Sequence, residues 1–520
     1  MHYSLRLFDF YERKTRQETS IDELAQIWQC STRYAKTIVK GLQQQQIIQW
    51  ETSRGRGKKP FMTLLQSKEF CVLQVFKTYW QKQHFEEAYA IASEHQMMQH
   101  PMIQTWIEQQ YGLKNKEYQH ILYVPYARTY LELDPMQANS NWDAHLIKQI
   151  HEPLFKENAT SGEIETNLLF AYETIDNQKW RFILRKCLYF HDLTPVKASD
   201  VQYSLERLTK FSAPYFSYKK IEQINDYELV VELSIPFAIF PELLATFRAV
   251  ILPQSTPNGT IGCGAFKLEN ATPYKIQLRA FEQYFDKRPF IDGVDLLADY
   301  SNTPFFVSEK PFAKDILQRE IVMNEVGIDY AVLNQNKKYL QDEKNRVQLL
   351  QLLDGKANVD LKELPKFFKI GYQYVSEQEN YLEQAQHIQQ KLTDYGIQIV
   401  LYKVAILENI SIDMELDVFL GGATFGKQKI LSILNLYFTK PQAIWYFQNE
   451  VGREKTRMRL EKLYAERNFS LDKEIMALQE AYFIKVLKRH AKKIYIQDGK
   501  AFKNLTLDQH GFINYHKAFI

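Results

Sequence analysis

The chain has 520 residues, of which 45% are hydrophobic and 14% aromatic, and its formal net charge is +3. This length exceeds what one hydrophobic core supports and predicts roughly three or four folding units, while the apolar content excludes a mainly disordered protein. The small total charge does not by itself indicate nucleic-acid binding. However, residues 1–65 carry an excess of five positive charges. That distribution is typical of a small nucleic-acid-binding head on a nearly neutral body.

Cysteine spacing and hydropathy narrow the choice of compartment. The four cysteines are far apart and form no CxxC pair, which favours reduced thiols over a disulfide framework or a zinc site. The first 17 residues lack the apolar core of a signal peptide, and no stretch reaches the roughly 18–20 apolar residues of a membrane span. We therefore expect a cytoplasmic protein with no membrane partner.

The first 50 residues predict three helices. Residues 3–17 are expected to form the first helix. Ser20 followed by Glu23 is an N-cap signature that starts a second helix at Ile21. After a short break, a third helix is predicted from about Ser31 to Gln44. Helix, tight turn and helix in this order predict a helix-turn-helix.

A basic hairpin is predicted directly after the third helix. Residues 47–50 and 61–65 favour two strands, and the glycine-rich loop between them carries four cations. Such a tip suits a phosphate backbone or a minor groove, so the whole predicts a winged helix that binds double-stranded DNA. On the third helix the aliphatic side chains fall on one side and the polar ones on the other. The predicted DNA-binding residues are Arg33, Lys36, Thr37, Lys40, Gln44, Arg54, Arg56, Lys58 and Lys59.

Residues 67–117 favour a helical connector, because apolar residues recur there at helical spacing. From residue 118 the pattern changes to strands alternating with helices. A strand is predicted at residues 121–124, a helix near 144–150 and an alternating strand from Lys179 to Phe190. Asp200 is expected to cap the next helix, and another strand follows from Tyr227 to Leu233.

One segment of this body carries a family signature. The stretch Phe190-His191-Asp192-Leu193-Thr194-Pro195, continuing through Asp200-Val201-Gln202-Tyr203-Ser204-Leu205-Glu206-Arg207, resembles the FHDGTP…DVxYSLER signature of family 5 extracellular solute-binding proteins. Further landmarks occur in the expected order at residues 133–135, 151–155, 180–186, 233–240 and 261–268. The resemblance covers about residues 119–520 and implies an α/β, two-lobed, type II periplasmic-binding-protein-like body, with a second lobe at about 266–415.

The chain departs from this family at two places. Leu193 replaces the usual glycine, so we expect a different backbone in that turn. Residues 421–426 read GGATFG where transport members carry a Trp–Asp-like ligand-contacting segment, which leaves a peptide ligand in doubt. Ligands of α/β folds bind near the carboxyl ends of strands. The ligand-binding candidates are Tyr126, Arg128, Tyr130, Trp142, Thr424 and Phe425.

Together with the N-terminal part, the order of domains resembles SgrR-like transcriptional regulators. The segment from Trp50 to Lys59 matches their wing. The resemblance implies a regulator that senses a small metabolite, a sugar, sugar phosphate or peptide. We also expect a homodimer, because one small DNA-binding head gives limited affinity and specificity. Two alternatives remain: a solute-binding component of a peptide or nickel transporter, and a protein–protein adaptor that uses the winged helix.

Catalysis and cofactors are not predicted. His191 and Asp192 are adjacent, so on a strand they point to opposite faces, and no nucleophile motif accompanies them. The glycines around Cys263 lack the GK[ST] ending of a phosphate loop. The histidines at 84, 95, 100 and 120 show no metal-binding spacing. We expect neither an enzyme, a cofactor nor a metal site.

Overall fold

The computed structural model divides into two compact units, each built from segments that are distant in the sequence. Unit 1 contains residues 1–130, 270–277 and 294–305, and unit 2 contains residues 131–269, 278–293 and 306–520. The domain limits expected from the sequence stay predictions. The residues that the structure describes are 2–52, 58–116, 119–126, 131–138, 140–158, 161–212, 217–298, 307–308, 311, 318–353, 365–374, 381–405, 415–425, 432–433, 436–437, 442–466, 470–481, 483–497 and 513–515.

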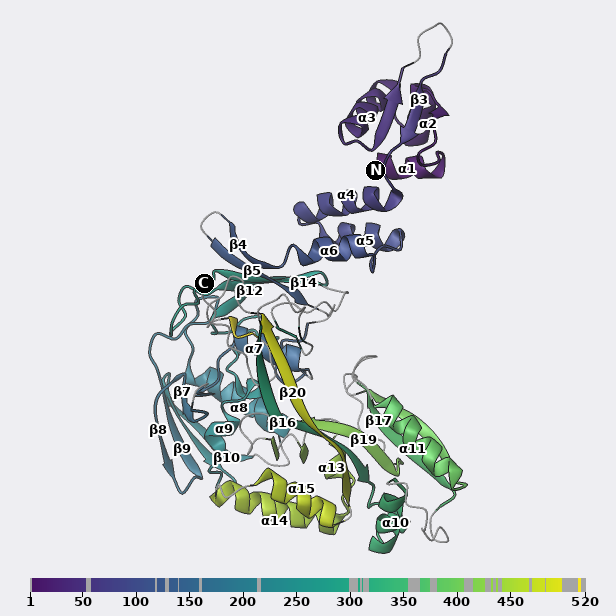
Figure 1. The fold of residues 1–520 in the computed structure, drawn as a ribbon. Coiled ribbons are helices and arrows are strands. Elements are labelled where there is room, and N and C mark those ends of the chain that lie inside the picture. Colours follow the sequence, from purple (N-terminus) through teal and green to yellow (C-terminus); the bar gives the residue numbers. More distant parts are fainter. Residues whose placement is uncertain are drawn as a thin grey trace. The chain divides into compact units, whose positions relative to one another are not determined.

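Unit 1 begins with a winged helix (Figure 1). A tight turn joins helices α2 and α3, and strands β2 and β3 form an antiparallel hairpin after α3. The sheet order is β1-β3-β2. The elements are α1 Tyr3–Arg6, β1 Gln17–Glu18, α2 Ile21–Trp28, α3 Thr32–Gln44, β2 Ile48–Glu51 and β3 Phe61–Leu64. The predicted helix-turn-helix and its hairpin are confirmed.

Local capping explains why α2 and α3 form where the sequence predicts them. The Ser20 hydroxyl oxygen accepts a hydrogen bond from the backbone N–H of Glu23, and the Glu23 carboxylate accepts one from the backbone N–H of Ser20. At α3 the Ser31 side chain accepts a hydrogen bond from the backbone N–H of Tyr34. Between the helices, Gln29 has a φ of 53°, a left-handed conformation that ends α2.

The predicted first helix, residues 3–17, is wrong. Only Tyr3–Arg6 is α-helical, and a single 3-10 turn follows at Leu7–Asp9. The chain then turns through Lys14, whose φ is 59°, and Gln17 pairs with Met62 in the sheet. A strand partner 45 residues away therefore overrides the local helical pattern.

Below the winged helix, three helices continue the same hydrophobic core. They are α4 Lys68–Gln81, α5 Phe85–Glu94 and α6 Pro101–Glu108. Residues 112–116 were expected to be helical but form strand β4, because they pair with β5. The buried cluster that starts in the winged helix runs through these helices to β5 and to Leu297 and Ala298 of β14. These strands belong to a five-stranded sheet in the order β12-β13-β14-β5-β4, with β4 Gly112–Lys116, β5 Gln119–Tyr126, β12 Phe266–Thr272, β13 Lys275–Ala280 and β14 Gly293–Ala298.

Unit 1 is held together at this sheet by specific contacts. The Tyr89 hydroxyl of α5 donates to the carbonyl oxygen of Ala298, and its ring stacks on Tyr274 at 5.0 Å between centroids. Lys275 Nζ lies 2.8 Å from Asp295 Oδ2, and both side chains are almost fully buried. The winged helix, the helices and the returning strands therefore share one core.

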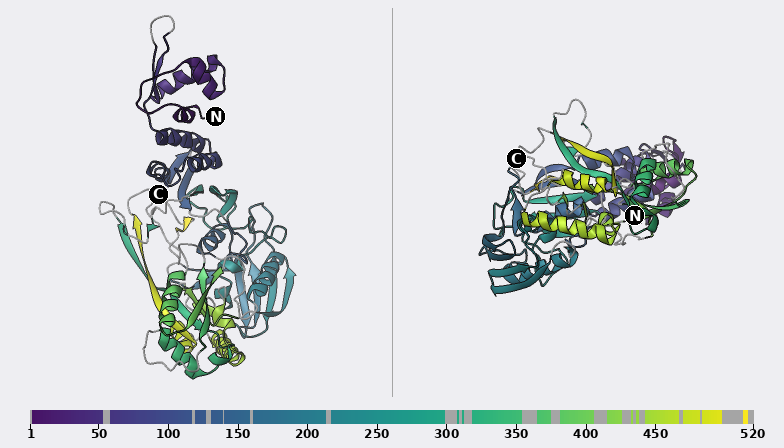
Figure 2. Two further views of the ribbon diagram at one scale, coloured as in Figure 1. Left: turned by 90° about the vertical axis from the view of Figure 1, so that its right-hand side faces the viewer. Right: turned by 90° about the horizontal axis from the view of Figure 1, so that it is seen from below.

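Unit 2 contains a four-stranded antiparallel sheet in the order β10-β11-β9-β8, and a second, six-stranded sheet in the order β15-β20-β16-β19-β17-β18. The long strands β16 and β20 lie side by side, as Figure 2 shows in green and yellow. Residues of both sheets contribute to the largest buried cluster.

The strands of unit 2 are β6 Phe155–Glu157, β7 Ile164–Thr166, β8 Leu169–Ile175, β9 Lys179–Leu184, β10 Tyr218–Asn225, β11 Glu228–Leu233, β15 Val307–Ser308, β16 Gln318–Leu333, β17 Phe367–Tyr374, β18 Gln398–Ala405, β19 Val418–Thr424 and β20 Ile484–Gln497. Its helices are α7 Asn141–Ile150, α8 Ala198–Ser212, α9 Phe240–Leu243, α10 Glu343–Leu353, α11 Leu382–Asp394, α13 Ala443–Tyr446, α14 Glu450–Glu466 and α15 Leu471–Glu480.

Two predicted boundaries in unit 2 need correction. The strand expected to reach Phe190 ends at Leu184, because the chain turns at Cys187, whose φ is 58°. Asp200 is not the residue before its helix, which begins at Ala198. Asp200 is the third residue of the helix, and its carboxylate accepts a hydrogen bond from the backbone N–H of Lys197, the residue before the helix, at 2.9 Å.

Candidate nucleic-acid interface and ligand-binding residues

Helix α3 has one buried face and one polar face. Its aliphatic side chains Ala35, Ile38, Val39 and Leu42 are buried in the core of unit 1. The five predicted DNA-contacting residues of the helix, Arg33, Lys36, Thr37, Lys40 and Gln44, are all exposed. Three of them are cations, so this helix presents positive charge and hydrogen-bond donors to the solvent.

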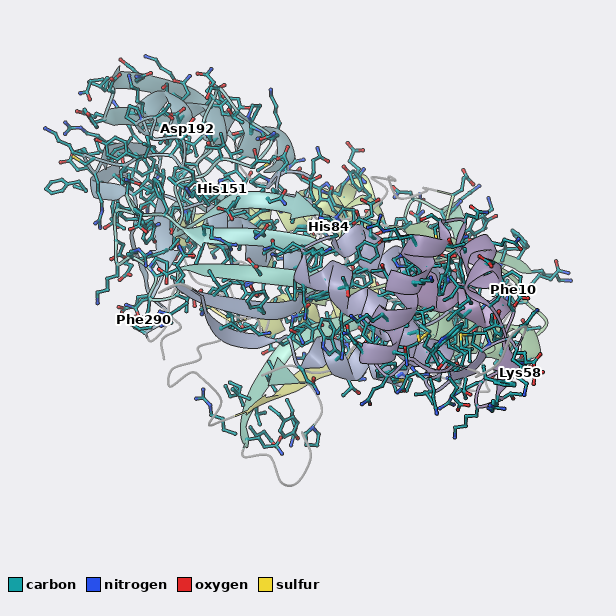
Figure 3. All side chains as sticks on the ribbon, turned by 90° about the horizontal axis from the view of Figure 1, so that it is seen from above. Phe10, Lys58, His84, His151, Asp192 and Phe290 are labelled. Atoms are coloured by element: carbon teal, nitrogen blue, oxygen red, sulfur yellow. The ribbon has the colours of Figure 1, made fainter. Side chains whose placement is uncertain are left out.

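The wing is described except for its tip. Strands β2 and β3 pair in register from Ile48 opposite Leu64 to Glu51 opposite Phe61. The predicted residues Arg54 and Arg56 lie outside the described residues. Lys58 is exposed and extends from the winged helix (Figure 3).

Lys59 makes an intramolecular contact. Its Nζ lies 2.5 Å from Glu23 Oε1, and this hydrogen bond raises the pKa of Lys59 and lowers that of Glu23. Glu23 also completes the N-cap of α2 through its other oxygen. The ion pair therefore ties the base of the wing to the first helix of the helix-turn-helix. Sequence reasoning identified Glu23 as a cap but not as the partner of Lys59.

A second contact fixes the opposite strand of the wing. Arg16 Nε donates to Glu51 Oε2 at 2.9 Å, and its guanidinium lies 3.5 Å from the centroid of the Phe61 ring. Arg16 thus bridges the two wing strands from the segment that precedes α2. Arg16 is not among the residues predicted from the sequence to bind DNA.

The ligand-binding candidates lie in both units. Tyr126 is buried at the end of β5 in unit 1. In unit 2, Trp142 is half-buried on α7, where its ring meets His145 edge-on at 6.2 Å. Thr424 is exposed at the end of β19, and the next residue, Phe425, is buried. Arg128 and Tyr130 lie outside the described residues.

Phe425 lines a small hollow on the second sheet of unit 2. The other lining residues come from β16, α15 and β20: Gly327, Ile328, Leu471, Asp472, Ile475 and Arg489. Two of these lining residues, Arg489 and Asp472, form an ion pair at 2.8 Å. Phe425 therefore shares this hollow with two strands and one helix, an arrangement that the sequence pattern did not predict.

The signature segment forms a turn with a structural role. His191 Nε2 donates to the carbonyl oxygen of Gly264 at 3.0 Å, and the N–H of Gly262 donates to His191 Nδ1 at 3.3 Å. One ring nitrogen donates and the other accepts, so the imidazole is neutral. Burial accordingly lowers the pKa of His191 to about 4.

Leu193 stands where the family has glycine, and the expectation that the turn has a different backbone from the family's stays a prediction. Its φ is 68°, the left-handed conformation that glycine adopts without strain. The turn is closed by Asp192, whose Oδ1 accepts from the N–H of Thr194 at 3.0 Å. The turn thus has a backbone that suits glycine although it carries a leucine, a residue that is 57% exposed.

Other landmarks of the resemblance contact one another. Both carboxylate oxygens of Asp134 accept hydrogen bonds from Arg207 Nη2 at 2.6 Å. This contact joins the landmark at residues 133–135 to the last residue of the signature segment, on α8. His151 Nε2 donates to Gly259 at 2.7 Å, and burial lowers the pKa of His151 to about 3. Residues that looked like a motif in the sequence are therefore the internal ties of one fold.

Within the described parts of the chain, no helix is long and apolar enough to cross a membrane. Among those same residues, no group of three or more His, Cys, Asp or Glu side chains could hold a metal ion.

Comparison with protein families gives two matches. Residues 1–114 match the N-terminal domain described as sugar transport-related sRNA regulator, SgrR. Residues 159–362 match the middle part of the bacterial extracellular solute-binding proteins of family 5.

Individual relatives are similar to this chain at low sequence identity. An uncharacterized protein of Bacillus subtilis, YhjP, is 24% identical over 97% of this chain and 96% of its own length. The HTH-type transcriptional regulator SgrR of Yersinia enterocolitica is 28% identical over 54% of this chain and 50% of its own length. That of Photorhabdus laumondii is 27% identical over 56% and 53%. The chain thus spans about half the length of the SgrR regulators that it matches.

Solved structures show the fold of the body. A dipeptide-binding protein from Pseudoalteromonas in complex with Met-Leu has a TM-score of 0.59 at 14% identity, covering 77% of this chain and 99% of that one. The binding protein AgaA from Agrobacterium tumefaciens, in complex with agropinic acid, has a TM-score of 0.57 at 18% identity, covering 74% and 94%. The chain thus carries a match to the SgrR N-terminal domain followed by a match to the family 5 extracellular solute-binding proteins, and it is similar to the SgrR regulators over about half of their length.

Proposed function

We propose that the chain is a cytoplasmic, non-catalytic transcriptional regulator that binds double-stranded DNA through its winged helix and a small metabolite through its solute-binding body. The observation that carries the proposal is the exposed polar face of α3, with Arg33, Lys36 and Lys40, on a winged helix joined to such a body. The named regulators among its relatives support it.

The proposed mechanism couples the two functions. Solute-binding bodies close around their ligand, and a ligand shifts the balance between two states only as far as it prefers one of them. A homodimer would place two heads on two half-sites, so that a change in their spacing alters the affinity for the operator. The ligand we propose is a sugar, a sugar phosphate or a short peptide.

The test is DNA binding by the purified full-length chain. Fragments of the genome that encodes it, including the region upstream of its own gene, are titrated at two salt concentrations in the presence of competitor DNA. Saturable and sequence-selective binding is expected. Weak, unselective binding that disappears at moderate salt would refute gene regulation and favour the protein–protein adaptor.

A matched pair of variants locates the interface. Lys40→Ala should weaken binding and, if it removes one phosphate contact, lower the slope of log affinity against log salt by about 0.9. Lys82→Ala removes an exposed lysine just after α4, away from α3, and should change neither. Sugar phosphates and dipeptides are then added to the same assay, and a shift in DNA affinity identifies the ligand class.

A further inference from the structure

Helix α3 contains a glycine in its interior. Gly41 is the tenth of its 13 residues, and the backbone continues helically through it to Gln44. Apart from proline, glycine is the least favourable residue in a helix interior, because it loses the most backbone freedom on folding. A glycine at this place therefore weakens the helix that carries the candidate DNA-contacting residues.

Nothing inside the described fold requires this glycine. A Cβ atom added at Gly41 would meet no atom within 4 Å, and its φ is not in the left-handed region. Gly262 and Gly264 differ in this respect, because a Cβ there would collide with the backbone of Ile150. The fold needs those two glycines for close packing, whereas an alanine at position 41 fits without any shift.

Gly41 lies beside the polar face of α3. At about 100° per residue, it is about 40° from Thr37 and about 60° from Gln44 around the helix axis. Lys40 precedes it, and all three neighbours are exposed. Gly41 is itself half-buried and also about 60° from the buried Ile38, so the missing side chain leaves bare helix backbone at the edge of a surface that is rich in donors and positive charge.

We propose that Gly41 is the point of closest approach between α3 and DNA, where the absent side chain admits the sugar–phosphate backbone at the rim of the major groove. This rests on the proposed DNA binding. A glycine that weakens its helix without serving the packing is expected at a functional contact. The cations of α3 supply the complementary charge for a phosphate at this position.

The proposal predicts opposite changes in stability and affinity. In the full-length chain, Gly41→Ala should raise the melting temperature of unit 1 by about 2–4 °C, through better helix propensity. It should also weaken binding to the genomic fragment selected by the wild-type chain by about tenfold or more. Gly41→Gln, which adds the longer side chain that Gln44 carries on the same helix, should weaken DNA binding further.

Thr78→Ala is the matched control, because Thr78 is exposed on α4 and the change also raises helix propensity. It should stabilise unit 1 and leave DNA affinity unchanged. If Gly41→Ala is stabilised and binds the fragment as tightly as the wild type, the close approach is refuted while DNA binding stands. If Gly41→Ala is less stable, the fold needs the glycine and the proposal fails. If the wild-type chain itself binds no DNA, the proposed function fails as well.

Discussion

The buried ion pair between Lys275 and Asp295 offers the sharpest test of what stabilises unit 1. Lys275 and Asp295 lie on the neighbouring strands β13 and β14, 2.8 Å apart, with 6% and 2% of their side chains exposed. Lys275 Nζ also lies 5.2 Å from the centroid of the Phe85 ring, which links the sheet to the first residue of α5. Asp295→Asn removes one charge and leaves the ammonium group buried.

The size of the effect follows from desolvation. Breaking a buried pair by removing one partner costs about 3–5 kcal/mol, because the other charge stays buried without compensation. For a unit of this size, that corresponds to a fall in melting temperature of roughly 6–20 °C. Replacing both residues with apolar ones of similar volume, Lys275→Met with Asp295→Leu, should cost far less, since no charge is left buried.

Thermal unfolding of the full-length variants measures this loss. Limited proteolysis of the same variants then reports the stability of the N-terminal 130 residues. Glu222→Gln in the exposed pair of Lys220 and Glu222 serves as the control and should leave the melting temperature unchanged. If Asp295→Asn stays within about 1 kcal/mol of the wild type, or the double variant is as unstable as the single one, the reasoning from buried charge is wrong.

Two other predictions concern the signature turn. Leu193→Gly should stabilise unit 2 by about 0.5–1 kcal/mol, because relief of the left-handed strain exceeds the entropy cost of glycine; a lower melting temperature would contradict this. His191 is neutral in the fold, with its pKa lowered to about 4, whereas the unfolded chain takes up its proton near pH 6.5. The contribution of His191 to the free energy of unfolding should therefore fall by about 1.4 kcal/mol for each pH unit that the pH is lowered from 6.5 to 4. In thermal unfolding at successive pH values, the free energy of unfolding of His191→Asn should fall less steeply with decreasing pH than that of the wild type. Equal slopes would exclude the imidazole as the cause.

Local signals decided which elements could be predicted from the sequence. Helices α2 and α3 follow from their Ser caps and apolar spacing, and the exposed face of α3 follows from the same periodicity. The first helix failed because Gln17 pairs with Met62, and strand β4 was missed because its only cue is its partner β5. Such pairings depend on distant segments, which a local pattern does not contain.

The candidate site shows the same division. The cations of α3 could be predicted because each lies on a regular helix. The contact between Lys59 and Glu23 could not, since 36 residues separate them and both residues had another use in the sequence pattern. The left-handed backbone at Leu193 contradicts the preference of its own side chain, and it is the surrounding turn that imposes it.

The composition of unit 1 has a consequence for synthesis on the ribosome. Its core includes Leu297 and Ala298, which are translated roughly 170 residues after the first 130 residues of the unit. At about 5–20 residues per second, the nascent N-terminal segment would wait roughly 10–30 s for its last strand. During that interval Tyr89 lacks the carbonyl group of Ala298 and the ring of Tyr274. The chain gains a complete unit 1 only after much of unit 2 has emerged, so a prematurely terminated chain should be a good substrate for proteases and, under the proposed function, a poor competitor for DNA.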